Sequence, residues 1–242
     1  MINREAFIAP FESTLRGRNK SYKKGDYIYA YEDLEAECKV DAKSIDVELL
    51  AACINDRTRI DGVVVRDETH KFYKNGPDTC AVISNFEQID ENGNVVKNDI
   101  PVIKLKNGRI LVKSPNLDLP VLFRIERKFA KGEEFYDTIM DSLATWEYLG
   151  TLQKEAADVA FWLDDYHFTM TAANGYCGTN VLSQLEIEFD GYAKNKKEPS
   201  ITQILKGFDD VFNILPVGYL SYLTTTTKAE WLAEYGDAHV RQ

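Results

Sequence analysis

Residues 101–131 read PVIKLKNGRILVKSPNLDLPVLFRIERKFAK, and this stretch decides the fold expected for the first half of the chain. Asn107-Gly108 is a preferred centre for a two-residue hairpin turn, so it predicts antiparallel strands over 103–106 and 109–112. The run over 120–129 alternates in the same way and predicts a third strand. One face would carry Ile103, Leu105, Ile110 and Val112, and the other face would be largely basic.

Upstream of this stretch, the pattern extends the sheet towards the N-terminus. Asn-Gly pairs at 75–76 and 92–93 predict further turns, and runs over 27–31, 62–66 and 80–86 predict further strands. A short helix is expected over 46–54.

Downstream of Gly132 the apolar period changes from two residues to about 3.6, which predicts helices over 135–146 and 152–167. Capping-box sequences at Ser200 with Gln203, and at Thr227 with Glu230, predict helices over 201–214 and from 228 to Gly236. Strict alternation predicts one strand over 181–189, with Glu186 and Glu188 pointing outward from the core.

The chain is therefore expected to be an α+β protein. Its N-terminal half would be rich in antiparallel β-sheet and would pack against a helix-rich C-terminal half. The strand pattern is compatible with a flat sheet and with a barrel-like sheet. Residues 1–131 would form the β-rich region and residues 132–242 the helical region. Both are expected to belong to one continuous domain, because no Pro/Ser-rich linker separates them.

The charge of the chain is divided in the same way. The net charge is −10, but residues 1–130 hold 21 basic and 21 acidic residues, whereas residues 131–242 hold 8 basic and 18 acidic residues. A basic sheet face beside an acidic helical region is typical of self-association or of a charged partner.

Composition and motifs exclude several classes of function. With 44% hydrophobic residues a packed core is expected, and no apolar run is long enough to cross a bilayer. The N-terminal MINREAFIAP lacks the apolar segment of a signal peptide, and the four cysteines are scattered, so we expect reduced thiols and a cytoplasmic (or virion) location. Phosphate-binding and dinucleotide-binding glycine motifs are absent, and no cofactor is expected.

Catalytic or metal-binding chemistry has few candidates in this sequence. Asp164 and His167 would share one face of the predicted 152–167 helix and are weak candidates for a metal site or for a hydrolase site. Cys177 lies in a glycine-rich loop. It could form a catalytic Cys-His pair, but the simpler interpretation is a buried or half-buried thiol in a turn.

Basic and aromatic residues favour a single-stranded nucleic-acid binder as one alternative. Alternate tyrosines in a strand beside lysines and arginines can stack on bases and follow phosphates. The candidate residues are Arg16, Arg18, Lys20, Tyr22, Tyr27, Tyr29, Tyr31, Lys104, Lys106, Arg109, Arg124 and Lys128. The same tyrosines could instead form a half-buried strand face that needs no ligand.

The preferred interpretation of the sequence is a non-enzymatic interaction or assembly protein, such as a component of a viral or phage-like complex. In this hypothesis the basic sheet of one copy meets the acidic helical region of the next. The expected partners are other proteins, including further copies of the chain, with single-stranded nucleic acid as the alternative and no membrane.

Overall fold

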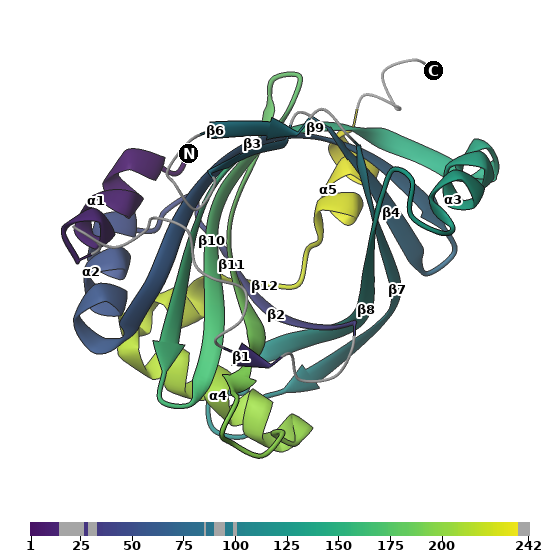
Figure 1. Ribbon diagram of the computed structural model, residues 1–242. Helices are drawn as coiled ribbons and strands as arrows, with labels where there is room; N and C mark the ends of the chain where they lie inside the picture. The colour runs from purple at the N-terminus through teal and green to yellow at the C-terminus, as the bar shows by residue number, and fades with distance from the viewer. Residues whose placement is uncertain (15–26, 29–32, 85, 90–94, 99–100, 237–242) are drawn as a thin grey trace.

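The computed structural model describes residues 1–14, 27–28, 33–84, 86–89, 95–98 and 101–236. Its centre is a closed antiparallel barrel of eight strands, in the order β11-β10-β9-β3-β4-β7-β8-β2. Pairing of β11 with β2, from Gln184 opposite Asp41 to Phe189 opposite Ala36, closes the ring that Figure 1 shows along its axis. The strands are β2 (Leu34–Asp41), β3 (Arg59–Asn75), β4 (Asp78–Ser84), β7 (Val102–Lys113), β8 (Pro120–Ala130), β9 (Glu147–Leu163), β10 (Tyr166–Cys177) and β11 (Asn180–Ala193).

In the parts of the chain that the structure describes, four short strands complete the β-structure. β1 (Tyr27–Ile28) pairs with the end of β11, and β12 (Leu223–Thr224) pairs with β2 at Val40 and Lys39, beyond the residues of β2 that pair with β8. β5 (Phe86–Ile89) and β6 (Val95–Asn98) form a separate two-stranded sheet.

Helices α1 (Arg4–Thr14), α2 (Val47–Arg57) and α4 (Ile201–Ile214) pack on the outside of the barrel (Figure 1). Alternate residues of the strands face these helices, because successive side chains of a strand point to opposite sides of a sheet. Ala36, Cys38 and Val40 of β2 join the largest apolar cluster in this way, as do Leu185, Ile187 and Phe189 of β11. The main hydrophobic core therefore lies between the barrel and its helices, and not inside the barrel.

The two capping boxes predicted from the sequence are confirmed. Ser200 and Gln203 cap α4, and Thr227 and Glu230 cap α5 (Lys228–Tyr235). Unlike the other helices, α5 lies inside the ring of strands (Figure 1), where Trp231 and Leu232 pack against Phe72 of β3 and Leu152 of β9. It fills one end of the barrel with apolar side chains. None of the described helices is both long enough and apolar enough to span a membrane.

Helices are not confined to the C-terminal half, and that part of the fold prediction was wrong. α1 and α2 belong to the first half, whereas three of the longest strands, β9, β10 and β11, lie between residues 147 and 193. The helix expected over 135–146 is α3 (Tyr136–Ser142) followed by the 3₁₀ turn η1 (Leu143–Thr145); a second 3₁₀ segment, η2 (Val217–Tyr222), follows α4. The division into regions 1–131 and 132–242 stays a prediction.

The segment 152–167, predicted as a helix, forms most of β9 and the turn into β10. Both faces of the second half of β9 are covered, so every residue from Ala156 to Trp162 is buried and the exposed positions no longer alternate with buried ones. A strand buried on both sides loses the alternation that would distinguish it from a helix.

The hairpin predicted at Asn107-Gly108 is a bulge within a single strand. β7 continues through both residues, and its pairing with β8 shifts register between Asn107 and Ile110. Gly108 has a φ of 67°, a left-handed conformation that only glycine adopts readily. The sequence correctly indicated a left-handed glycine at this position, but the glycine forms a bulge that bends one strand and not a turn between two strands.

We expect Gly108→Ala to lower the free energy of unfolding by about 1–2 kcal/mol, because alanine is strained in the left-handed region. No atom lies within 4 Å of the position that a Cβ would take there, so the loss would come from the backbone alone. Gly218→Ala is the matched control, since that site is equally open but has no positive φ. Urea unfolding of both variants measures the difference, and equal midpoints would contradict the bulge.

Candidate functional site

The inside of the barrel contains rows of ionisable side chains. They alternate along the strands with the residues that face the outer helices, so they point inward. We call this set the charged lumen; it comprises Glu35, Glu37 and Lys39 of β2, Arg66, Glu68 and His70 of β3, Lys104 and Lys106 of β7, Arg124, Glu126 and Lys128 of β8, Lys154 and Asp158 of β9, and Glu186, Glu188 and Asp190 of β11.

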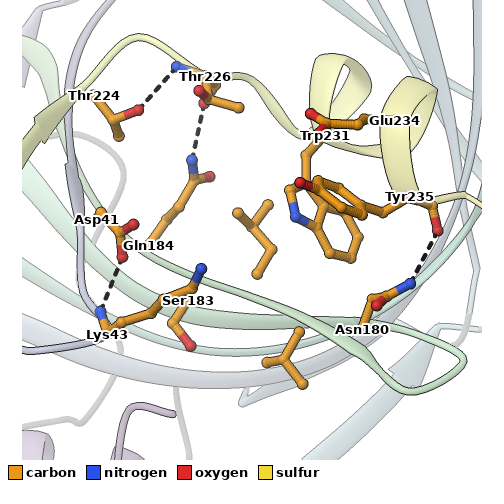
Figure 2. Close-up of a pocket in the computed structure, with 12 residues that line it drawn as sticks. Asp41, Lys43, Asn180, Ser183, Gln184, Thr224, Thr226, Trp231, Glu234 and Tyr235 are labelled. Atoms are coloured by element: carbon orange, nitrogen blue, oxygen red, sulfur yellow. Dashed lines mark hydrogen bonds between the residues drawn. The ribbon is translucent and has the colours of Figure 1, made fainter.

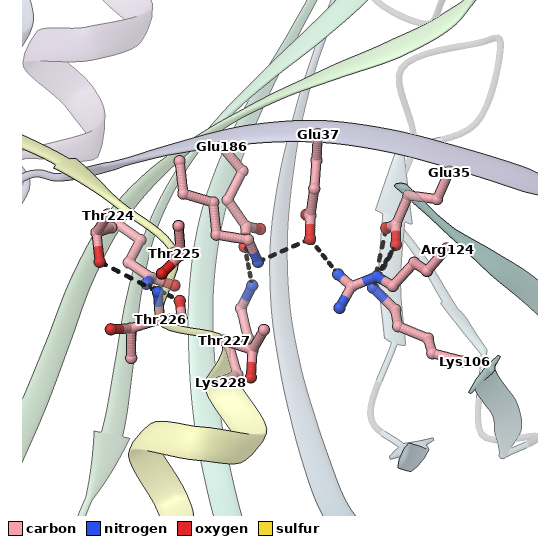
Figure 3. Close-up of polar contacts among 12 residues, drawn as sticks. Glu35, Glu37, Lys106, Arg124, Glu186, Thr224, Thr225, Thr226, Thr227 and Lys228 are labelled. Carbon is pink, nitrogen blue, oxygen red and sulfur yellow. Dashed lines mark hydrogen bonds and ion pairs between the residues drawn. The ribbon is translucent and has the colours of Figure 1, made fainter. Parts of the chain in front are cut away.

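Arg124 lies at the centre of the charged lumen. Its guanidinium donates to Glu35 through Nε and to Glu37 through Nη2 (Figure 3). Lys106 adds a second cation to Glu35, with its Nζ 2.9 Å from Oε1. Burial alone would raise the pKa of Glu37, but Lys39 and Arg124 hold it at about 2. Glu37 is therefore charged at neutral pH.

A lysine from α5 reaches the same cluster. Lys228 and Lys39 both bind Oε1 of Glu186, with the Lys39 Nζ at 2.9 Å (Figure 3). Burial lowers the pKa of Lys228 to about 7, although Glu186 opposes the shift. This position therefore gains or loses its positive charge near neutral pH.

A second network lies on β3 and β9. Arg66 binds Glu68 at 2.9 Å and also pairs with Asp158, while Lys154 Nζ lies 3.7 Å from Glu68. His70 Nε2 is 2.7 Å from Glu68, and burial lowers the pKa of His70 to about 4. His70 is thus a neutral hydrogen-bonding group at pH 7.

Glu188 differs from the other lumen carboxylates. Burial and the nearby carboxylates of Glu35 and Glu126 raise its pKa to about 8, and only partial opposition comes from Lys104. Carboxylates gathered in this way favour an additional positive charge. Within the described parts of the chain, however, no group of three or more His, Cys, Asp and Glu side chains is arranged to hold a metal ion by itself.

His167 is fully buried, and two aspartates bind its ring. Nδ1 lies 2.8 Å from Asp190 and Nε2 lies 3.1 Å from Asp61. Burial would lower the pKa of His167, but its hydrogen bonds to Asp190 and Asp61 raise it. Asp164, the other residue of the predicted pair, lies in the β9–β10 turn and acts electrostatically on Asp210 of α4. The structure thus gives His167 partners other than Asp164.

The raised pKa of His167 predicts how stability depends on pH. Its contribution should be fully present below the unfolded-state pKa of about 6.5 and should decline as the pH rises through the folded-state pKa. We expect His167→Gln to destabilise the protein more at about pH 6 than at about pH 9. Urea unfolding of both proteins at the two pH values gives this difference, and a larger loss at the higher pH would contradict the paired imidazolium.

Of the basic residues proposed for nucleic-acid binding, those that the structure describes do not gather on one outer surface. Lys104, Lys106 and Arg124 point into the lumen, and Lys128 binds Glu126 at its rim. Arg109 of β7 pairs with Glu230 of α5 and donates to the carbonyl of Thr225. Tyr27 lies in β1, opposite Ala193 of β11. Arg16, Arg18, Lys20, Tyr22, Tyr29 and Tyr31 lie outside the described residues.

Sequence reasoning missed the carboxylates of the charged lumen. Glu186 and Glu188 face away from the main apolar core, as expected, but that direction is the enclosed barrel interior, because the apolar side of β11 packs on the outer helices. The segment 34–41, LEAECKVD, was not predicted as a strand, although its charged residues alternate with small apolar ones. That alternation, repeated over 104–106, 124–128 and 186–190, was the available indication.

Comparisons with known proteins find likenesses among solved structures. No protein-family model and no curated protein matches the chain. A conserved hypothetical protein from Pyrococcus furiosus is 8% identical, with a TM-score of 0.46 over 81% of this chain and 98% of that one. A Vibrio parahaemolyticus protein described as a candidate adenylate cyclase is 12% identical, with a TM-score of 0.45 over 84% and 99%. The S. pombe RNA triphosphatase Pct1 is 12% identical, with a TM-score of 0.41 over 88% and 93%. At these values the likenesses assign neither a family nor an activity.

The expectation of a non-enzymatic assembly protein was wrong. It required the basic strands to present an outer surface to the acidic region of another copy. Lys104, Lys106 and Arg124 instead bind carboxylates of the same chain inside a closed barrel. These basic side chains are therefore neutralised within their own chain and do not form a surface for another copy.

Proposed function

We propose that the charged lumen binds the triphosphate group of a substrate and hydrolyses it with the help of a divalent cation. The observation that carries the proposal is the cluster of Lys39, Lys106 and Arg124, which are bound to carboxylates inside a closed barrel. Burying ion pairs costs desolvation energy, and an apolar filling of the same space would be at least as stable. The buried ion pairs are therefore better explained by ligand binding than by a contribution to stability.

A linear chain of phosphates suits the cations of the lumen. Arginine and lysine bind phosphate oxygens through short charge-assisted hydrogen bonds, and several cations in a row can bind successive phosphates. Burial would lower the pKa of Lys39, but Glu186 and Glu37 raise it, so the lysine stays charged. The lumen carboxylates thus hold the lysine and arginine side chains in place. On substrate binding, phosphate oxygens would take the place of these carboxylates.

The carboxylates suit a divalent cation that binds together with the substrate. Magnesium is usually held by one or two carboxylates plus water and substrate phosphates, so a complete protein ligand set is not required. Two lumen carboxylates, Glu126 and Glu188, would hold it; burial, together with the charge of Glu126, raises the pKa of Glu188. Such a cation neutralises charge that develops on the phosphates during hydrolysis. The S. pombe Pct1 structure is described as that of an RNA triphosphatase, an activity of the same chemical class.

Release of phosphate from inorganic tripolyphosphate tests the proposal. The purified chain is expected to release phosphate with Mg²⁺ or Mn²⁺, and to stop when a chelator removes the cation. A protein in which Glu126 and Glu188 are both replaced by glutamine is the negative control for contaminating phosphatases. If the wild-type chain releases no phosphate from tripolyphosphate or from nucleoside triphosphates with either cation, the proposed activity is wrong.

A further inference from the structure

A cavity of about 370 Å³ opens beside α5, at the end of the barrel that this helix occupies. Its walls come from the last residues of β2, the first residues of β11, the segment before α5 and α5 itself (Figure 2). Gln184, Trp231 and Tyr235 are among the residues that line it. The proposed phosphate chemistry does not use any of these three residues.

Gln184 presents an unused hydrogen-bond acceptor to this cavity. The side chain is buried, with 2% of its surface exposed, and among the described residues its Oε1 has no hydrogen-bond partner. Its Nε2 donates to the carbonyl of Thr226 at 2.8 Å. Because a carbonyl only accepts, the amide cannot be turned around, and the oxygen is fixed towards the cavity (Figure 2).

Two aromatic rings form another wall of the cavity. Trp231 and Tyr235 lie with ring centroids 5.5 Å apart and an angle of 36° between their planes. Aromatic rings of this kind stack on flat heterocycles, whose faces they cover without selecting a particular one. Stacking on Trp231 and Tyr235 would therefore provide the affinity for a flat ring. A hydrogen bond from the ring to Gln184 would provide the selectivity.

The cavity continues the charged lumen along two strands. Gln184 is two residues from Glu186 on the same face of β11, and Asp41 is two residues from Lys39 on the same face of β2. Two residues of a strand span about 7 Å. A single small molecule can bridge that distance, with its ring in the cavity and its phosphates beside Lys39 and Lys228.

From this geometry we infer that the cavity binds a nucleobase, or a similar planar ring with an N–H donor, and that Gln184 selects the N–H edge. The inference rests on the proposed function, because the ring would be the head group of the triphosphate substrate. Gln184 is then a specificity-determining residue and takes no part in the chemical step.

Gln184→Met tests the inference, since methionine fills similar space without an acceptor. We expect kcat/KM for ATP to fall about tenfold, mostly through KM, and kcat/KM for tripolyphosphate to stay within about twofold. Gln153→Met on the outer face of β9 is the matched control and should change neither value. Adenosine alone should quench the fluorescence of Trp231, and Trp231→Phe should remove that signal.

The outcomes separate the inference from the proposed function. If tripolyphosphate is hydrolysed and Gln184→Met lowers both kcat/KM values equally, or adenosine produces no quenching, the inference is wrong and the proposed function stands. If adenosine binds but no triphosphate is hydrolysed, the proposed function is wrong and the ring site stands.

Discussion

Replacing Arg124 with methionine is expected to lower the free energy of unfolding by about 3–5 kcal/mol. Arg124 is the shared partner of Glu35 and Glu37, and the side chains of all three are largely buried. In the variant, two buried carboxylates would lose a positively charged partner. The free-energy penalty of such unpaired buried charges exceeds the net stabilisation that the intact ion pair provides.

The change can be measured by urea unfolding with a control on the same strand. Arg127 binds Asp33 at 2.8 Å, but its side chain is 56% exposed, so Arg127→Met should cost less than about 1 kcal/mol. Adding Glu37→Gln to Arg124→Met should recover part of the loss, because one of the uncompensated charges is removed. Equal effects of Arg124→Met and Arg127→Met would show that the lumen is as well solvated as the outer surface.

Replacing Lys39 with methionine is expected to lower kcat/KM for tripolyphosphate by about 10- to 100-fold, the loss of one charge-assisted contact. The side chain of Lys39 is buried and pairs with both Glu37 and Glu186. Its neighbours keep other partners, since Arg124 still binds Glu37 and Lys228 still binds Glu186. The variant should therefore fold, and circular dichroism can verify this.

The exposed Lys71 of β3 supplies the matched control, because Lys71→Met removes the same charge from the chain without touching the lumen. Its kcat/KM should stay within about twofold of wild type. Lys106→Met provides a second lumen variant and should behave like Lys39→Met. If the lumen variants retain full activity while remaining folded, phosphate binding occurs elsewhere.

Local signals in the sequence predicted local structure well. The capping boxes at Ser200 and Thr227 require only residues three positions apart, and both helices begin where expected. The alternation over 181–189 correctly predicted a strand. These features depend on short-range hydrogen bonds and periodicity, which a sequence displays directly.

The missing information concerned which side of each strand is the inside. Alternation divides β11 into two faces, but it does not say that the apolar face meets outer helices and that Glu186 faces the barrel interior. The pairing of β11 with β2 joins residues about 150 positions apart, and only this closure turns the charged face into an enclosed site. α5 likewise has an ordinary amphipathic sequence, and its place inside the barrel follows from tertiary packing on Phe72 and Leu152.

Calorimetric titration with inorganic tripolyphosphate tests most directly whether the charged lumen is a phosphate-binding site. The wild-type chain and Lys71→Met are expected to bind one tripolyphosphate per chain with the same affinity, and Lys39→Met is expected to bind it at least about tenfold more weakly. Absence of binding to the wild-type chain, or equal affinities of wild type and a folded Lys39→Met protein, would contradict the account.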